Sequence, residues 1–257
     1  MIATIPHGGR VIPDEYARSL AVPADELWAD WYTSELYDFL ADVGVTSVCT
    51  DLSRFVADPN RDPTSGHGDF WKAVVPDTDP MGAAIYRASL TEGEIERRIA
   101  LAHQPFHDLL DGELETMLCE HPRVLLLDLH SFGVPLDVDV VLGDGHGSAA
   151  RPSVVKIVDD AVTGAGFMTA RNLRFPGGWI VRRFIDCDRV DAIAVELNQR
   201  CYLDPAAVDA WPNVPTLDPP RLAEMQGRLS AAILNVVERL VSATPQNTSV
   251  RPATVAL

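Results

Sequence analysis

The stretch Val124-Leu-Leu-Leu-Asp128-Leu-His130-Ser131 decides the fold class of this chain. Its continuous apolar run predicts a strand that is covered on both faces, as in a parallel sheet between helices. Side chains alternate along a strand, so Asp128 and His130 point to the same side. Burying a carboxylate and an imidazole at the edge of a core is costly unless each has a partner. We therefore expect a functional site at the end of this strand.

Further strands and helices are predicted on both sides of this stretch. Strand-like apolar runs cover residues 45–50 and 192–196, and a short apolar start precedes His7. Apolar residues at helical spacing predict helices over 25–42, 91–119 and from 219 to about 240. Alternation of this kind indicates an α/β protein with a mainly parallel or mixed central sheet flanked by helices. We expect one catalytic domain over residues 1–243 and a flexible C-terminal tail over 244–257.

Two details refine the helix over 91–119. Thr91 precedes Glu94 by three residues, which predicts a capping box at the N-terminus, and Pro105 predicts a kink or a break.

Composition excludes several classes of protein. The 257 residues include 21 Lys and Arg against 37 Asp and Glu, a net charge of −16, which argues against a nucleic-acid surface. The sequence contains no uninterrupted run of about 18 apolar residues, so no membrane span is predicted. No signal peptide is predicted at the N-terminus. The four cysteines lack C-x-x-C spacing and are expected to be reduced and mostly structural, as in a cytoplasmic protein.

Polar groups also follow the other predicted strands, where ligands of open α/β sheets bind. His7 precedes two glycines that permit a tight turn. Glu196 ends an apolar strand, and a carboxylate in a dry environment is a good general base. Asn60 and Arg61 lie between two prolines and could hold a carboxylate. A Gly-Gly turn and a predicted strand lead to Arg182.

These residues supply what a zinc hydrolase needs, which is three nitrogen or oxygen ligands, a base and cations for an anionic substrate. A metallophosphoesterase is a weaker alternative. Asp128-x-His130 resembles its opening motif, but the sequence contains no Gly-Asn-His element.

Seven short motifs, in this order and spanning about residues 5–204, resemble the N-formylglutamate amidohydrolase (deformylase) family. They are Pro6-His7-Gly8-Gly9, Asp30-Trp31 with Glu35-Leu36-Tyr37, Ser53-Arg-Phe-Val-Ala-Asp58-Pro-Asn60-Arg61, Asp128-Leu-His130-Ser131, Leu142-Gly-Asp144-Gly-His-Gly147, Gly177-Gly-Trp-Ile-Val-Arg182 and Glu196-Leu-Asn198-Gln-Arg-Cys-Tyr202.

The resemblance implies a fold similar to zinc carboxypeptidases and aspartoacylases, and a cytoplasmic enzyme of histidine degradation. It implies removal of the formyl group from an acidic N-formyl amino acid, most simply N-formyl-L-glutamate. A deacylase for another N-acyl amino acid and a non-catalytic binding protein are the alternatives. The small-molecule substrate is the only partner implied, with no nucleic acid and no membrane, and the oligomeric state is left open.

The resemblance also implies roles for individual residues. His7 and His130 would bind the metal, expected to be Zn²⁺ although manganese, iron or cobalt would also suit. Glu196 would be the catalytic carboxylate, and Asn60, Arg61 and Arg182 would bind the substrate carboxylates.

The third metal ligand departs from the pattern of the wider superfamily, which uses His-x-x-Glu. Here Arg10 stands three residues after His7 and cannot bind a metal. A carboxylate from elsewhere in the chain must therefore be the third ligand. The resemblance implies Asp30, which matches an Asp-Trp of the family, with Asp128 as the rival. If His7 and His130 share one ion through bonds near 2.1 Å, their rings must lie within about 5 Å of each other.

Overall fold

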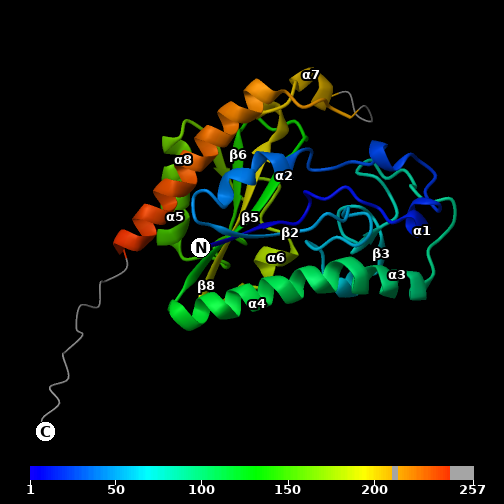
Figure 1. Cartoon of the computed structure of the whole chain (residues 1–257), viewed down its shortest axis with the longest axis horizontal. Helices are drawn as coiled ribbons and strands as arrows, with labels where there is room; N and C mark the ends of the chain where they lie inside the picture. The colour runs from blue at the N-terminus through cyan, green and yellow to red at the C-terminus, as the bar shows by residue number, and fades with distance from the viewer. Residues whose placement is uncertain (210–213, 244–257) are drawn as a thin grey trace, which may run out of the picture.

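The computed structural model, which describes residues 1–209 and 214–243, is built on a six-stranded sheet between helices (Figure 1). The strand order is β2-β1-β5-β8-β6-β7. Each pair of neighbouring strands is parallel except β8 and β6, which are antiparallel. The predicted α/β class with a mainly parallel or mixed sheet is thereby confirmed. The strand bounds are β1 Ile2–Ile5, β2 Thr46–Cys49, β5 Val124–Phe132, β6 Val140–Gly143, β7 Thr169–Arg171 and β8 Val190–Asn198.

Alternate residues of β5 face two different apolar layers. Leu125, Leu127 and Leu129 pack in the core that includes α5 (Pro152–Gly164) and α8 (Pro219–Ala243). Leu126 faces the opposite layer with α4 (Gln104–Glu120) and α6 (Trp179–Arg182). Figure 1 shows α5 and α8 together on one side of the sheet and α4 on the other. The two-residue period therefore directs Asp128 and His130 toward the layer that contains α4 and α6.

The helix predicted over 91–119 is confirmed with an interruption. It consists of α3 (Glu92–Arg98), a π-helical turn (Ile99–His103) and α4. Thr91 caps α3, because its side chain accepts a hydrogen bond from the Glu94 amide. Pro105 lies at the start of α4, where its missing N–H disturbs the regular ladder least, so the π-helical turn takes the place of a sharp kink. The last predicted helix corresponds to α8.

The helix predicted over residues 25–42 is wrong. The segment contains a 3-10 turn (Ala24–Glu26), α2 (Thr33–Leu36) and a second 3-10 turn (Asp38–Leu40), and Tyr32 interrupts it with a left-handed φ of 58°. The apolar residues do not form one stripe, because Leu27 packs in a different core from Trp31 and the residues after it. Burial in two separate cores thus overrides the helical spacing.

A third apolar cluster lies beside the sheet and is formed largely by residues 16–27 and 52–90. It carries the short pair β3 (His67–Gly68) and β4 (Val75–Pro76), and the remaining helices are α1 (Asp14–Ala17) and α7 (Pro205–Val208). This cluster holds the segments at 53–61 and 70–72 against the ends of the central strands.

Two of the expectations, on membrane spans and on cysteines, can be compared with the structure. None of the helices in the described ranges is long and apolar enough to cross a bilayer. The cysteines are unpaired, but Cys49, Cys119 and Cys187 are exposed, so the expected structural role is wrong for these three. The tail predicted over 244–257 lies outside the described residues.

Candidate metal and catalytic centre

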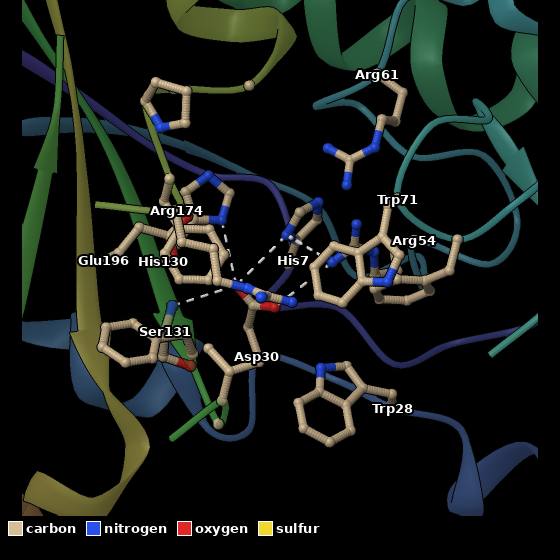
Figure 2. Close-up of a pocket in the computed structure, with 18 of the residues that line it drawn as sticks. His7, Trp28, Asp30, Arg54, Arg61, Trp71, His130, Ser131, Arg174 and Glu196 are labelled. Atoms are coloured by element: carbon tan, nitrogen blue, oxygen red, sulfur yellow. Dashed lines mark hydrogen bonds and ion pairs between the residues drawn. The ribbon is translucent and has the colours of Figure 1, made fainter. Parts of the chain in front are cut away.

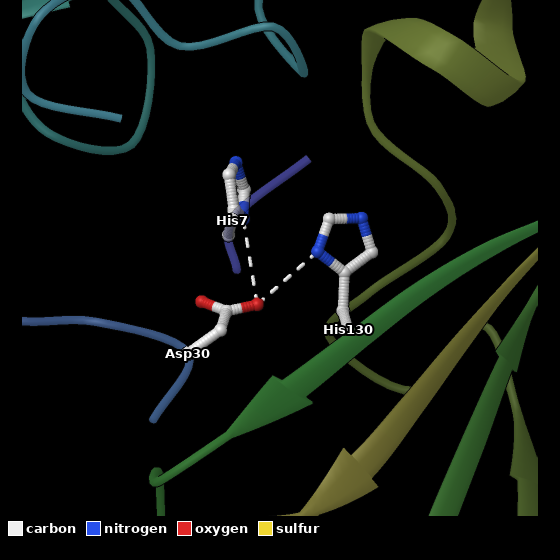
Figure 3. A group of neighbouring side chains, drawn as sticks. All are labelled: His7, Asp30 and His130. Carbon is white, nitrogen blue, oxygen red and sulfur yellow. Dashed lines mark hydrogen bonds and ion pairs between the residues drawn. The ribbon is translucent and has the colours of Figure 1, made fainter. Parts of the chain in front are cut away.

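Three buried side chains from distant parts of the sequence converge at the ends of β1 and β5. His7 and His130 each direct Nδ1 toward Oδ2 of Asp30, at 3.4 and 3.2 Å respectively (Figure 3). The two ring centroids are 4.7 Å apart, within the limit that a shared ion requires. The Ser131 amide also donates to Asp30 Oδ2, which orients this carboxylate. These are the three residues predicted as metal ligands, and one candidate ligand atom from each lies within 4.8 Å of the others.

The outer nitrogen of each histidine faces a further buried carboxylate. His7 Nε2 is 2.7 Å from Asp58 Oδ1, and His130 Nε2 is 2.9 Å from Asp128 Oδ2. Asp128 therefore lies behind His130, on the side away from Asp30. Arg10 is exposed and its guanidinium stacks on the Trp31 ring.

Charges around His130 favour a cation at this centre. Burial alone would lower the pKa of His130, but the charges of Asp128 and Glu196 and the hydrogen bonds to Asp128 and Asp30 raise it well above its usual range. Burial would likewise raise the pKa of Asp30, yet His7 and His130 lower it. The carboxylate at the centre is therefore ionised.

Glu196 lies beside this centre on the neighbouring strand β8, paired in register with His130. Its side chain lines the adjoining cavity together with His7 and His130. Burial raises the pKa of Glu196 to about 7, with Asp30 and Asp128 contributing and the histidines opposing. A carboxylate with such a pKa can both accept and return a proton near neutral pH.

Asn60 occupies a position different from the expected one. It is buried, and its side-chain nitrogen lies 3.1 Å from Asp128 Oδ2 and 2.9 Å from His130 Nε2. Its side-chain oxygen accepts from the Ile180 amide, and its carbonyl accepts from the Trp179 amide. Asn60 is not among the residues that line the cavity. It instead joins His130 to the first turn of α6.

The strand predicted after the Gly-Gly turn is also wrong, because residues 179–182 form the short helix α6. Asn60 satisfies two of the free amides at the start of this helix. A Cβ on Gly178 would lie 2.3 Å from Oδ1 of Asn60, so this close approach requires glycine. Arg182 at the end of α6 is thereby brought to the cavity.

The cavity beside the histidines has a volume of about 560 Å³, within the usual range for small-molecule sites (Figure 2). Five cationic side chains line it, against two carboxylates from Asp30 and Glu196. The cationic residues are Arg54, Arg61, Lys72, Arg174 and Arg182. In a protein with a net charge of −16, this local excess of positive charge indicates an anionic ligand.

Arg61 and Arg182, the predicted ligands of the substrate carboxylates, both line this cavity. The Arg61 guanidinium donates to the Asn60 carbonyl, while its buried Nε has no partner among the described residues. Burial lowers the pKa of Arg61, an effect that Asp58 opposes and that the charges of Arg54 and Arg182 strengthen. An anion bound between these guanidiniums would relieve their repulsion.

No role was predicted for Arg54 from the sequence. It is buried and pairs with Asp58 at 2.5 Å, and its Nη1 lies 3.4 Å from His7 Nδ1. The Phe70 ring lies beneath its guanidinium, 4.3 Å from centroid to Cζ. The spacing of four residues from Asp58 did not predict this pair, because residues 54–58 form a turn and a loop and not a helix.

Comparisons with known proteins identify the family of this chain. The N-formylglutamate amidohydrolase family model matches residues 1–203. A protein from Pseudomonas aeruginosa named N-formylglutamate deformylase is 28% identical over 225 residues, which cover 82% of this chain and 85% of the relative. A protein of the same name from Pseudomonas putida is 28% identical over 218 residues, covering 79% of this chain and 82% of the relative.

Solved structures share the fold. The crystal structure of an N-formylglutamate amidohydrolase from Ralstonia eutropha superimposes with a TM-score of 0.79 at 21% identity, covering 95% of this chain and 94% of the other. A gene product from Agrobacterium tumefaciens gives a TM-score of 0.67 at 17% identity, covering 93% and 91% of the two chains. The extent of the family match leads to one conclusion: the chain belongs to the N-formylglutamate amidohydrolase family and is a hydrolase that acts on an amide C–N bond.

Proposed function

We propose that this protein is a metal-dependent deformylase that converts N-formyl-L-glutamate to formate and glutamate. The observation that carries the proposal is the convergence of His7, Asp30 and His130 beside Glu196 in a cationic cavity. The names of the Pseudomonas relatives support the substrate.

The ligand set that we propose is His7 Nδ1, His130 Nδ1 and Asp30. Tetrahedral bonds of about 2.0–2.1 Å separate neighbouring ligand atoms by about 3.4 Å. The distances of 3.4 and 3.2 Å from the two imidazoles to Asp30 Oδ2 agree with that spacing. Two imidazoles and a carboxylate suit Zn²⁺, which we expect. Asp58 and Asp128 would orient the rings, as carboxylates commonly do behind metal-bound histidines.

When bound, a divalent ion at this position acts as a Lewis acid and lowers the pKa of water toward neutrality. The residues of the chain supply the remaining functions. Glu196 accepts the proton of the attacking water and returns it to the leaving amine. Arg54 directs one guanidinium nitrogen toward the same centre and stabilises negative charge on the formyl oxygen. Arg61 and Arg182 hold substrate carboxylate through paired hydrogen bonds.

The same centre would serve a deacylase for a different N-acyl amino acid, so the acyl group must be measured. We propose a panel of N-formyl, N-acetyl and N-succinyl amino acids, with amine release as the readout, on protein purified without chelator. Fastest turnover of N-formyl-L-glutamate supports the proposal. Preference for an acetyl or succinyl substrate would reassign the acyl group, and activity that survives complete metal removal would exclude the metal mechanism.

A further inference from the structure

Arg174 reaches the cavity without a carboxylate partner. In the described part of the chain it forms no hydrogen bond or ion pair, and its one recorded contact is with the Trp71 ring, 5.4 Å from Cζ to the centroid. Both residues line the cavity. Figure 2 labels Arg174 near His130 and Glu196, and Trp71 on the other side of His7, so the contact joins two different segments that line the cavity. An exposed guanidinium held only by an aromatic face is free to pair with an anion.

The backbone that carries Arg174 is held in an uncommon conformation. Asn172 and Arg174 have φ angles of 54° and 65°, in the left-handed region that non-glycine residues rarely adopt. The side-chain nitrogen of Asn172 donates to the carboxylate of the buried Asp144, and its side-chain oxygen accepts from the Asp144 backbone N–H. Arg171 also pairs with Asp144. Such strain persists only where surrounding contacts fix it, and it is typical of ligand-binding segments.

The segment that carries Trp71 is fixed as well. Trp71 donates its indole N–H to the Pro80 carbonyl and packs edge-on against Phe70 at 5.0 Å. Phe70 in turn lies under Arg54, next to the metal ligands. Lys72 follows Trp71 and lines the same cavity, with no ion pair among the described residues. Lys72 and Arg174 are both exposed and line the cavity from segments other than those that carry Arg61 and Arg182.

Arg61 and Arg174 differ in burial and in the contacts that their guanidiniums make. Arg61 is half-buried, bonded to the Asn60 carbonyl and affected by the charges of Asp58 and Glu196, so it belongs to the inner part of the cavity. Arg174 is exposed and contacts only an aromatic face. Every N-formyl amino acid has a carboxylate close to the scissile amide, whereas only an acidic one has a second carboxylate farther out.

We propose that Arg174, presented by Trp71 and assisted by Lys72, binds the side-chain carboxylate of the substrate and sets the preference for an acidic amino acid. Arg61 and Arg182 bind the carboxylate that all N-formyl amino acids share. This inference rests on the proposed function, since it concerns the substrate of the same site.

The test compares N-formyl-L-glutamate with N-formyl-L-glutamine, which has nearly the same shape and no side-chain charge. In Arg174→Gln, we expect the ratio of kcat/KM for the two substrates to fall about 100-fold, because a charge-assisted contact between guanidinium and carboxylate is lost for one substrate alone. Arg174→Lys should restore part of the ratio. Arg61→Gln should lower kcat/KM for both substrates and change their ratio little. Arg123→Gln, at an exposed position outside the cavity, controls for the change in net charge.

A parallel loss of kcat/KM for both substrates in Arg174→Gln would overturn the inference and leave the proposed function intact. Failure of the wild-type protein to hydrolyse any N-formyl amino acid would instead reject the proposed function. The affinities of L-glutamate and L-glutamine, measured by calorimetry, test the role of Arg174 without any need for turnover. Tighter binding of glutamate that disappears in Arg174→Gln supports the inference, and equal binding of both ligands to wild-type protein rejects it.

Discussion

Glu196 lies directly opposite His130 in the register of the parallel strands β5 and β8. Neighbouring strands are about 4.8 Å apart, so the proposed proton acceptor and a proposed metal ligand occupy adjacent positions on one face of the sheet. Backbone pairing, rather than a loop, fixes their relative position. Sites built on strands hold their geometry more closely than sites built on loops.

This relationship leads to a prediction for Glu196→Gln. Glutamine has the same shape but cannot accept a proton, so kcat should fall by about 100- to 10,000-fold. The metal content, measured by mass spectrometry of the purified protein, should remain equal to that of the wild type. Loss of metal together with activity would show that Glu196 is a ligand and not the base.

Asp58→Asn should weaken metal binding without abolishing it. Asp58 contacts His7 Nε2 at 2.7 Å, and replacing such a carboxylate typically lowers metal affinity by about 10- to 100-fold. Asp30→Ala removes a proposed ligand and should leave no stoichiometric metal. Titration of metal-free protein with Zn²⁺ against a competing chelator measures both effects. Equal affinities for the two variants would contradict the distinction between ligand and supporting residue.

Gly178→Ala should destabilise the protein, because the new Cβ would overlap with the Asn60 side chain. Overpacking of this kind costs about 1–3 kcal/mol, and Tm falls by about 2–4 °C per kcal/mol in a protein of this size. A matched control is Gly112→Ala, which lies in α4 with no described atom within 4 Å of the added Cβ. It should raise the stability by about 0.5–1 kcal/mol. A Gly178→Ala variant as stable as the wild type would refute the tight contact.

His107→Gln should reduce the dependence of stability on pH. His107 lies between the Pro59 carbonyl and the Arg183 guanidinium, and burial lowers its pKa to about 4, with His103 and Arg183 contributing. In the unfolded chain the same group titrates near 6.5. Between these values the unfolded state binds more protons, so stability falls as the pH is lowered from about 6.5 to 4, by about 3 kcal/mol in total.

Glutamine keeps a donor and an acceptor at position 107 but does not titrate. Urea denaturation at pH 7 and pH 4.5 should therefore show a smaller loss of unfolding free energy for this variant than for the wild type. An identical loss in both proteins would mean that other groups account for the acid sensitivity.

The sequence predicted those parts of the site that depend on strand periodicity. Asp128 and His130 share a face because side chains alternate, and the apolar run before them identified the central strand. The sequence could not show whether Asp128 is a metal ligand or a carboxylate that orients His130. That choice depends on which nitrogen of the His130 ring faces Asp128.

Predictions failed where the side chains of one segment face more than one core or bond to a distant element. The segment over 25–42 loses its helix because its apolar residues enter two separate clusters. Asn60 was expected in the cavity, but its amide satisfies the end of α6, an element that the sequence suggested as a strand. Local spacing carries no information on either relationship.

His7, Asp30 and His130 lie on three segments that meet only when β1 has paired with β5. In the unfolded chain, intervals of 23 and 100 positions separate them, so no chelating group exists before the sheet assembles. A divalent ion would therefore bind the native state alone and add RT ln(1 + [ion]/Kd) to its stability. Metal supply would then govern how long the enzyme survives in the cell as well as how fast it turns over.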